Sequence, residues 1–163
     1  MNYELSRFIE YLPKGATICD LGAGEGETAA ELTLLGFQVT ALDNNLQALA
    51  TLKNLPGITV VNATLPEIPL KTKVDAIWCA NTLPWLSQPD QQATITEASR
   101  SLKPNGIFYC STRSPDARGK ASMLIAISPE KIKETFIQAE LTLMKDHPDA
   151  QDSKWHHWFA RKR

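Results

Sequence analysis

The chain has 163 residues, of which 43% are hydrophobic and 21% are charged, and its formal net charge is −1. This length and composition predict a single domain over residues 1–163, with a sizeable core and no second independent domain. The balanced charge gives no general attraction to nucleic acid or to a membrane surface, and no apolar run approaches membrane-spanning length.

The three cysteines all lie in or beside apolar runs, at Cys19, Cys79 and Cys110. Their spacing is unlike the C-x-x-C pattern of metal sites, so we expect no metal centre. Cysteines in such positions are typical of small buried hydrophobic side chains in a reducing compartment. The sequence therefore favours a cytoplasmic location, and nothing in it indicates an oligomeric state.

Apolar periodicity then divides the chain into alternating elements. Leu5, Phe8, Ile9 and Leu12 recur at helical spacing and predict a helix that stops at Pro13. Short apolar strands alternate with helical segments after that. The expected strands cover 16–21, 38–42, 59–62, 74–79 and 107–112, and the expected helices cover 27–35, 45–54 and 89–102. Such a series predicts a doubly wound parallel sheet.

The last third of the chain has a different pattern. Ser128 is a suitable N-cap for a helix over residues 129–139, which Pro129 would open. Two further strands, 141–145 and 155–160, are separated by the polar segment 146–154. A short polar connection between two strands is typical of an antiparallel hairpin.

The strongest functional signal lies at residues 18–26, which read Ile-Cys-Asp-Leu-Gly-Ala-Gly-Glu-Gly. A strand there runs into a turn with three glycines and then into a helix. Glycine permits positive φ and lets a ligand approach the main chain closely. Asp43 ends the next strand, 19 residues beyond Gly24, where an acid holds ribose hydroxyls in nucleotide-binding folds. The pattern favours a nucleotide-like cofactor over an ordinary tight turn with a surface aspartate.

Two classes of cofactor fit this layout, and the acidic residues distinguish them. The dinucleotide fingerprint G-x-G-x-x-G requires glycine at position 27, where this chain has Glu27. Glu25 adds a second carboxylate inside the turn. Both would repel a pyrophosphate, whereas a cofactor with a positive centre and no phosphates is compatible with them. The turn therefore favours S-adenosylmethionine over NAD.

The segment 20–26 resembles the D-x-G-x-G-x-G motif of class I S-adenosylmethionine-dependent methyltransferases. The similarity continues through Asp43 and through the segments 74–77, 83–86 and 100–108, and it covers roughly residues 14–112. The tail after Ser128 more loosely resembles the small tellurite- and thiopurine-type methyltransferases. This resemblance implies a Rossmann-like doubly wound sheet of seven strands, mostly parallel, with strand 7 antiparallel.

The resemblance also implies a set of cofactor-binding residues at the strand tips. Asp20 would orient the amino-acid part of the cofactor, and Asp43 would accept both ribose hydroxyls. The remaining members would pass under the ribose and methionine or line the adenine: Gly22, Ala23, Gly24, Asn44, Asn62, Ala63, Cys79 and Leu83.

Two of these positions allow other interpretations. Asn62 stands where the family often has aspartate, although an amide oxygen can still accept a bond from the adenine amino group. Cys79 would contact the methionine end through its backbone. Its thiol is also a possible nucleophile, but core packing is the favoured role.

The segment from Asn81 to Trp85 faintly resembles the N-P-P-Y motif of enzymes that methylate amino groups in nucleic acids. A nucleic-acid substrate is not the favoured interpretation of this segment.

The acceptor side is less defined. Residues 113–127 follow a strand and combine Arg113, Arg118 and Lys120 with apolar side chains. They fit either a lid over a small anionic or soft nucleophile, or a solvated loop. His156 and His157 are adjacent on a strand, so their side chains should point to opposite faces. One of them is a possible general base, and simple packing is the alternative.

The sequence thus predicts methyl transfer from S-adenosylmethionine to a small-molecule acceptor by in-line displacement, with no catalytic residue assigned. One alternative is a small NAD-dependent oxidoreductase. The other is a non-catalytic cofactor-binding or scaffold subunit that keeps the fold.

Overall fold

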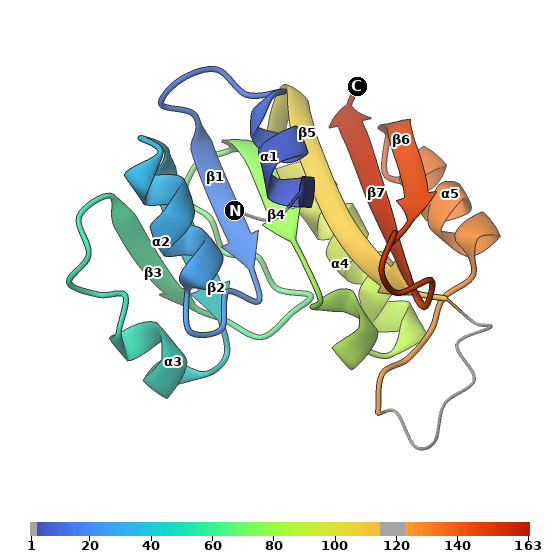
Figure 1. The fold of residues 1–163 in the computed structure, drawn as a ribbon, viewed down its shortest axis with the longest axis horizontal. Coiled ribbons are helices and arrows are strands. Elements are labelled where there is room, and N and C mark those ends of the chain that lie inside the picture. The colour runs from blue at the N-terminus through green and yellow to red at the C-terminus, as the bar shows by residue number, and fades with distance from the viewer. Residues whose placement is uncertain (1–2, 115–122) are drawn as a thin grey trace.

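The protein is described by a computed structural model that covers residues 3–114 and 123–163. A seven-stranded sheet forms its centre, with helices on both faces (Figure 1). The strands are β1 Thr17–Leu21, β2 Gln38–Asp43, β3 Ile58–Asn62, β4 Val74–Cys79, β5 Leu102–Arg113, β6 Leu141–Pro148 and β7 Trp155–Lys162. The helices are α1 Tyr3–Ile9, α2 Glu27–Leu34, α3 Leu46–Ala50, η1 Leu83–Trp85, α4 Gln88–Ser101 and α5 Pro129–Gln138.

The strand order is β3-β2-β1-β4-β5-β7-β6. The first five strands pair in parallel, while β7 lies antiparallel to both β5 and β6. This arrangement confirms the expected Rossmann-like sheet with a reversed seventh strand. The order reverses between β1 and β4, and ligands of open α/β sheets bind at the carboxyl ends of the strands beside such a switch point.

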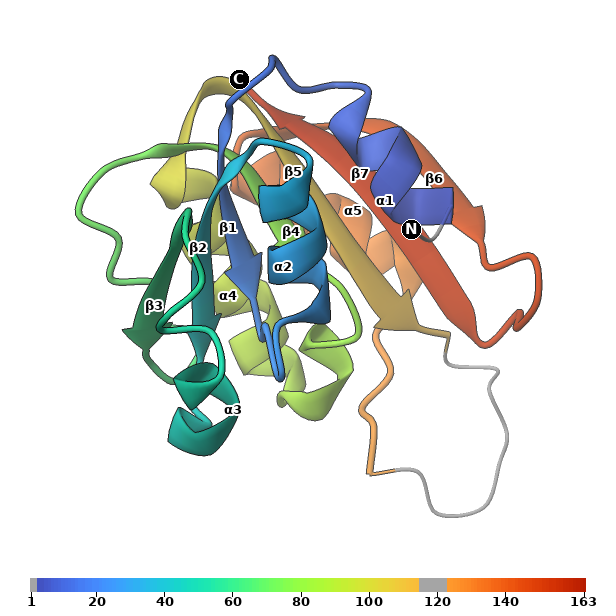
Figure 2. The ribbon, with the colours of Figure 1, turned by 60° about the vertical axis from the view of Figure 1, so that its left-hand side comes forward.

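Alternation along the buried strands supplies two hydrophobic cores, one on each face of the sheet. Ile18, Trp78 and Tyr109 face a cluster that includes side chains of α1 and α2. Their strand neighbours, such as Cys19 and Phe108, face a second cluster with α4 and α5. Figures 1 and 2 show these helix pairs on opposite sides of the sheet. None of the helices in the described ranges is both long enough and apolar enough to cross a membrane.

Several elements differ in extent from the sequence-based expectation; β6 and β7, for example, run on to Pro148 and Lys162. The helix expected over 45–54 is only α3, Leu46–Ala50, because the chain then tightens into turns in which Leu52 N–H bonds the Leu49 carbonyl at 3.1 Å. The strand expected over 107–112 extends back to Leu102, which pairs with Val74 across a register shift. Asn105 accommodates that irregularity with a φ of 64°, a conformation that asparagine tolerates.

Candidate functional site

The glycine-rich turn joins β1 to α2 and lies against the segment that follows β4. The Gly22 N–H donates to the Leu42 carbonyl at 2.8 Å, and the Thr82 hydroxyl donates to the Leu21 carbonyl at 2.9 Å. Gly22 has a φ of 71°, and a Cβ built on it would lie 2.3 Å from Thr82 Oγ1. Only glycine fits here, because a side chain would meet both backbone strain and the threonine.

Asp43 ends β2 and faces the same turn. Its Oδ2 accepts the Gly24 N–H at 2.9 Å, and its Oδ1 accepts the Asn45 N–H at 2.8 Å. These two bonds fix the orientation of the carboxylate. An ionised carboxylate can accept about four hydrogen bonds, so each oxygen keeps a lone pair for a ligand hydroxyl.

Asp20 lies one residue before the end of β1 and is only 3% exposed. Its Oδ2 has no hydrogen-bond partner within the described ranges. Burial raises the pKa of this carboxyl to about 7, and the nearby Asp43 charge adds to the effect. A buried acid of this kind is stabilised by a ligand that brings a positive charge or hydrogen-bond donors.

A pocket of about 340 Å³ opens beside these residues at the carboxyl ends of the central strands. This volume lies within the range of small-molecule and cofactor sites. Among the described residues, its lining comes from the glycine turn, the tip of β2 and the segments after β3 and β4: Gly22, Leu42, Asp43, Asn44, Ala63, Thr64, Leu65, Ala80, Asn81, Thr82, Trp85 and Leu86.

The structure places four of the predicted cofactor-binding residues in this lining. They are Gly22, Asp43, Asn44 and Ala63. The other six are not part of the lining and surround it: Asp20, Ala23, Gly24, Asn62, Cys79 and Leu83. The cofactor roles of all ten residues stay predictions. Four of the ten residues line the same pocket.

Three of these six residues have a structural role in the fold. The Asn62 side chain is exposed and donates its amide to the Asp43 carbonyl at 3.1 Å. Leu83 and Cys79 are fully buried in the core on the α4 side. Burial raises the pKa of the Cys79 thiol to about 12, so the thiolate needed by a nucleophile is not available near neutral pH. These contacts favour the packing role of Cys79.

From the segment after β4, sequence reasoning named Leu83 as a cofactor-binding residue and missed four residues that line the pocket. Asn81, Thr82, Trp85 and Leu86 all contribute to the lining. Asn81 has a φ of 55°, and its N–H donates to the Ser111 hydroxyl at 2.8 Å. A non-glycine residue held in the left-handed region is characteristic of functional sites. The available signal was the polar Asn-Thr pair directly after a buried strand.

The acceptor-side expectations have mixed outcomes. Arg118 and Lys120, which were expected in a basic lid, lie outside the described residues. His156 and His157 do point to opposite faces of β7, as predicted. The His156 Nε2 bonds Asp146 Oδ2 at 3.2 Å, whereas the His157 Nε2 bonds Asp149 Oδ2 at 3.0 Å.

A mostly parallel doubly wound sheet with a reversed β7, and a glycine turn facing an acid at the tip of β2, define the class I methyltransferase fold. The same fold is seen in a TehB-like SAM-dependent methyltransferase from Corynebacterium glutamicum, with a TM-score of 0.80. The two proteins are 19% identical, and the alignment covers 100% of this chain and 89% of the other.

Residues 19–110 match the family model described as a methyltransferase domain. The chain belongs to this family. It is 34% identical over 116 residues to a ubiquinone biosynthesis O-methyltransferase from Rickettsia prowazekii, covering 68% of this chain and 44% of the relative. It is 30% identical over 108 residues to a dimethylglycine N-methyltransferase from Parasynechococcus marenigrum, covering 60% and 37%. The chain thus spans less than half the length of these relatives.

The residues of the site fit S-adenosylmethionine, the cofactor of this class. Two carboxylates, the buried Asp20 and the pocket-lining Asp43, meet near the glycine turn. The buried Asp20 is compatible with a cationic ligand, and Asp43 is compatible with one that has ribose hydroxyls. The site is therefore compatible with S-adenosylmethionine, in agreement with the family.

Proposed function

We propose that this chain transfers a methyl group from S-adenosylmethionine to a small-molecule acceptor by in-line displacement. The observation that carries the proposal is the pocket at the switch point of the sheet, where Gly22 allows close approach and Asp43 presents an oriented carboxylate. The buried Asp20 oxygen without a partner in the described ranges supplies the second anchor.

The chain's own residues mainly bind, orient and exclude water. When bound, the cofactor supplies a methyl group already activated by a positively charged sulfur. Asp43 would hold the ribose through its free lone pairs, and Asp20 would face the ammonium end. The apolar side chains of Leu65, Trp85 and Leu86 would cover the pocket and keep water from it. Alignment of this kind accounts for much of the rate in displacement reactions.

The relatives support an acceptor of low molecular weight. Their names describe an O-methyltransferase of ubiquinone biosynthesis and an N-methyltransferase of dimethylglycine. For this chain we therefore propose an oxygen or nitrogen nucleophile on a small molecule. We also propose that residues 1–163 form one domain that acts in the cytoplasm, which the three free, buried cysteines support.

Calorimetric titration with S-adenosylhomocysteine and, separately, with NADH tests the cofactor. We expect S-adenosylhomocysteine to bind and NADH not to bind. Asp43→Ala should weaken S-adenosylhomocysteine binding by about tenfold or more, because a charge-assisted hydrogen bond is worth about 1.5–3 kcal/mol. Glu97→Ala is the matched control, since this carboxylate lies on α4 and pairs with Arg100 away from the pocket.

The outcomes separate the three functional hypotheses. Binding of NADH alone would contradict the methyltransferase proposal and favour the oxidoreductase. Equal affinity of the Asp43→Ala and Glu97→Ala variants would contradict the ribose role of Asp43. Binding of S-adenosylhomocysteine without methyl transfer to a broad panel of hydroxyl, amine and thiol acceptors would favour the non-catalytic scaffold.

A further inference from the structure

A second pocket lies on the other side of the segment that follows β4. It has a volume of about 420 Å³, and it shares Ala80 and Asn81 with the cofactor pocket. Its remaining walls come from α1, β4, β5, β7 and the loop between β6 and β7. Two cavities that meet at one strand end are suited to two reactants that must touch.

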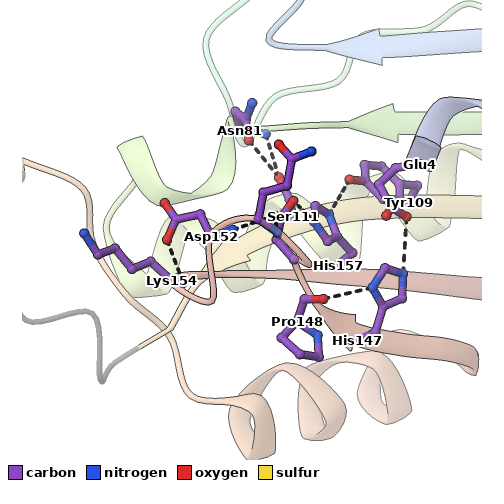
Figure 3. Close-up of polar contacts among 11 residues, drawn as sticks. Glu4, Asn81, Tyr109, Ser111, His147, Pro148, Asp152, Lys154 and His157 are labelled. Carbon is purple, nitrogen blue, oxygen red and sulfur yellow. Dashed lines mark hydrogen bonds and ion pairs between the residues drawn. The ribbon is translucent and has the colours of Figure 1, made fainter. Parts of the chain in front are cut away.

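A chain of hydrogen bonds forms one wall of this second pocket. The Tyr109 hydroxyl lies 2.8 Å from His157 Nδ1, and His157 Nε2 lies 3.0 Å from Asp149 Oδ2. Figure 3 shows the hydrogen bond between Tyr109 and His157 and the separate bonds between Asn81 and Ser111. Tyr109 and His157 are 2% and 7% exposed, whereas the Asp149 side chain is 33% exposed, so the chain leads from a buried hydroxyl to a carboxylate that water reaches.

The protons of this chain have a defined order. Asp149 accepts the backbone N–H groups of Asp152 and Gln151, and these bonds together with His157 lower its pKa to about 2. The ionised carboxylate can only accept, so His157 Nε2 donates the proton of this hydrogen bond. Nδ1 then accepts the Tyr109 O–H. Tyr109 Oη keeps lone pairs that can accept a hydrogen bond from a ligand.

The charge of the pocket disfavours anions. Glu4 contributes a half-buried carboxylate whose Oε2 lies 3.3 Å from His147 Nε2, and Asp149 contributes a second carboxylate that is 33% exposed. No lysine or arginine lines the pocket within the described ranges. Two arginines lie over rings of the lining: the Arg113 guanidinium is 5.8 Å from the centre of the Trp155 ring, and the Arg7 guanidinium is 5.9 Å from the centre of the Tyr3 ring. The titratable groups around His157 are Tyr109, His147, His156 and Asp149, and the charge of Glu4 acts on Tyr109.

Three further residues of the lining are aromatic. Tyr3 from α1, Trp78 from β4 and Trp155 from β7 contribute ring surfaces. Flat aromatic walls favour a planar ligand, since stacked and edge-on rings attract beyond their buried area. The pocket therefore combines aromatic rings, two carboxylates and a hydrogen-bonded chain of Tyr109, His157 and Asp149.

We infer that this pocket holds the methyl acceptor, that the acceptor is an uncharged aromatic ring bearing a hydroxyl group, and that Tyr109, His157 and Asp149 together receive its proton. The inference rests on the proposed methyl transfer. The acceptor proton passes to Tyr109 Oη as the Tyr109 proton passes to His157 Nδ1. The acceptor oxygen forms a bond to the methyl carbon, the carbon–sulfur bond breaks with its electron pair left on sulfur, and Asp149 stabilises the imidazolium until it releases its proton to water.

Binding is tested first, by NMR of protein labelled with ¹⁵N at histidine and saturated with S-adenosylhomocysteine. The probes are catechol, 3,4-dihydroxybenzamide and 3,4-dihydroxybenzoate. We expect the first two to shift the ring resonances of His157 and to leave those of His156, on the opposite face, unchanged. The benzamide should bind about fivefold or more tightly than the matched anion, because two carboxylates border the pocket. Glu4→Gln should reduce this difference.

The relay is tested by methyl transfer to 3,4-dihydroxybenzamide. Tyr109→Phe and His157→Gln should each lower kcat by about 100-fold, the typical contribution of positioned proton transfer. His156→Gln is the matched control and should change kcat little. The affinity for S-adenosylhomocysteine should stay within about threefold in all variants.

The results separate this inference from the proposal beneath it. Failure of the wild-type protein to bind S-adenosylhomocysteine would contradict the proposed function. Binding of S-adenosylhomocysteine with no effect of any probe on His157 would overturn the acceptor pocket and leave the proposed function standing. Equal kcat values for His157→Gln and His156→Gln would overturn the relay.

Discussion

Asp20 carries an ionisable group in a place that bulk water does not reach. Burial and the neighbouring Asp43 raise its pKa to about 7, whereas an unfolded aspartate titrates near 3.9. The folded state therefore holds a proton that the unfolded state releases between about pH 4 and pH 7. Stability falls as pH rises through this window, because deprotonation leaves a buried charge.

Asp20→Asn should remove this loss. Each unit of pKa difference corresponds to about 1.4 kcal/mol, so between pH 5 and pH 8 the variant should gain roughly 3 kcal/mol relative to the wild type. Urea denaturation at both pH values measures the difference, and other titrating groups cancel in the comparison. The same variant should bind S-adenosylhomocysteine more weakly. Equal pH dependence of the two proteins would show that Asp20 is ionised in the folded state.

At the scale of elements, the β1–α2 turn is the part of the site that the local sequence determines most directly. Gly22 and Gly36 both have positive φ, at 71° and 89°, but their surroundings differ. A Cβ on Gly22 would lie 2.3 Å from Thr82 Oγ1, whereas a Cβ on Gly36 would have no atom within 4 Å. Comparing a substitution at Gly22 with one at Gly36 therefore separates the cost of backbone strain from the cost of steric overlap.

Gly36→Ala should destabilise the protein by about 1 kcal/mol, the cost of a left-handed alanine. Gly22→Ala should cost about 1–3 kcal/mol more, because the Thr82 hydroxyl must leave its bond to the Leu21 carbonyl. It should also weaken S-adenosylhomocysteine binding, which Gly36→Ala should not do. Chemical denaturation and calorimetry measure both effects. Equal destabilisation by the two substitutions would show that Thr82 moves away without cost.

The hairpin of β6 and β7 shows what an element contributes when it pairs with a distant strand. Its antiparallel register sets Tyr109 opposite Phe159 and Ser111 opposite His157. This pairing brings His157 to Tyr109, 48 positions away in the chain. A helical crossover between β6 and β7, in place of the short loop, would have made β7 parallel to β5 and reversed the order of the β7 side chains along it.

At the scale of the whole molecule, cofactor binding should increase the stability of the folded state. Any ligand that binds only the folded state stabilises it, by about 2.7 kcal/mol at a concentration 100 times its Kd. S-adenosylhomocysteine should therefore raise the midpoint of thermal unfolding, and NADH should not. Asp43→Ala should lose most of this shift at the same ligand concentration. A shift that is unchanged in Asp43→Ala would place the bound ligand outside the pocket described above.

Much of the architecture could be predicted from the sequence, since short apolar runs alternate with helical segments and the turn at Gly22 to Gly26 has a distinctive composition. The end of α3 could not be predicted. Apolar spacing continues beyond Ala50, and only the tighter turns around Leu52 end the helix. The second pocket was equally hidden, because its walls come from α1, β4, β5 and β7.

The sequence by itself determined the order of the elements, the glycine turn and the acid at the tip of β2, because each depends on neighbouring residues and on backbone conformation. Only the tertiary structure decided which polar groups meet. It left Asp20 without a hydrogen-bond partner in the described ranges, packed Cys79 into the core, and joined Tyr109, His157 and Asp149 beside Asn81. Hydrogen bonds and burial depend on distances across the sheet, and strand pairing sets those distances.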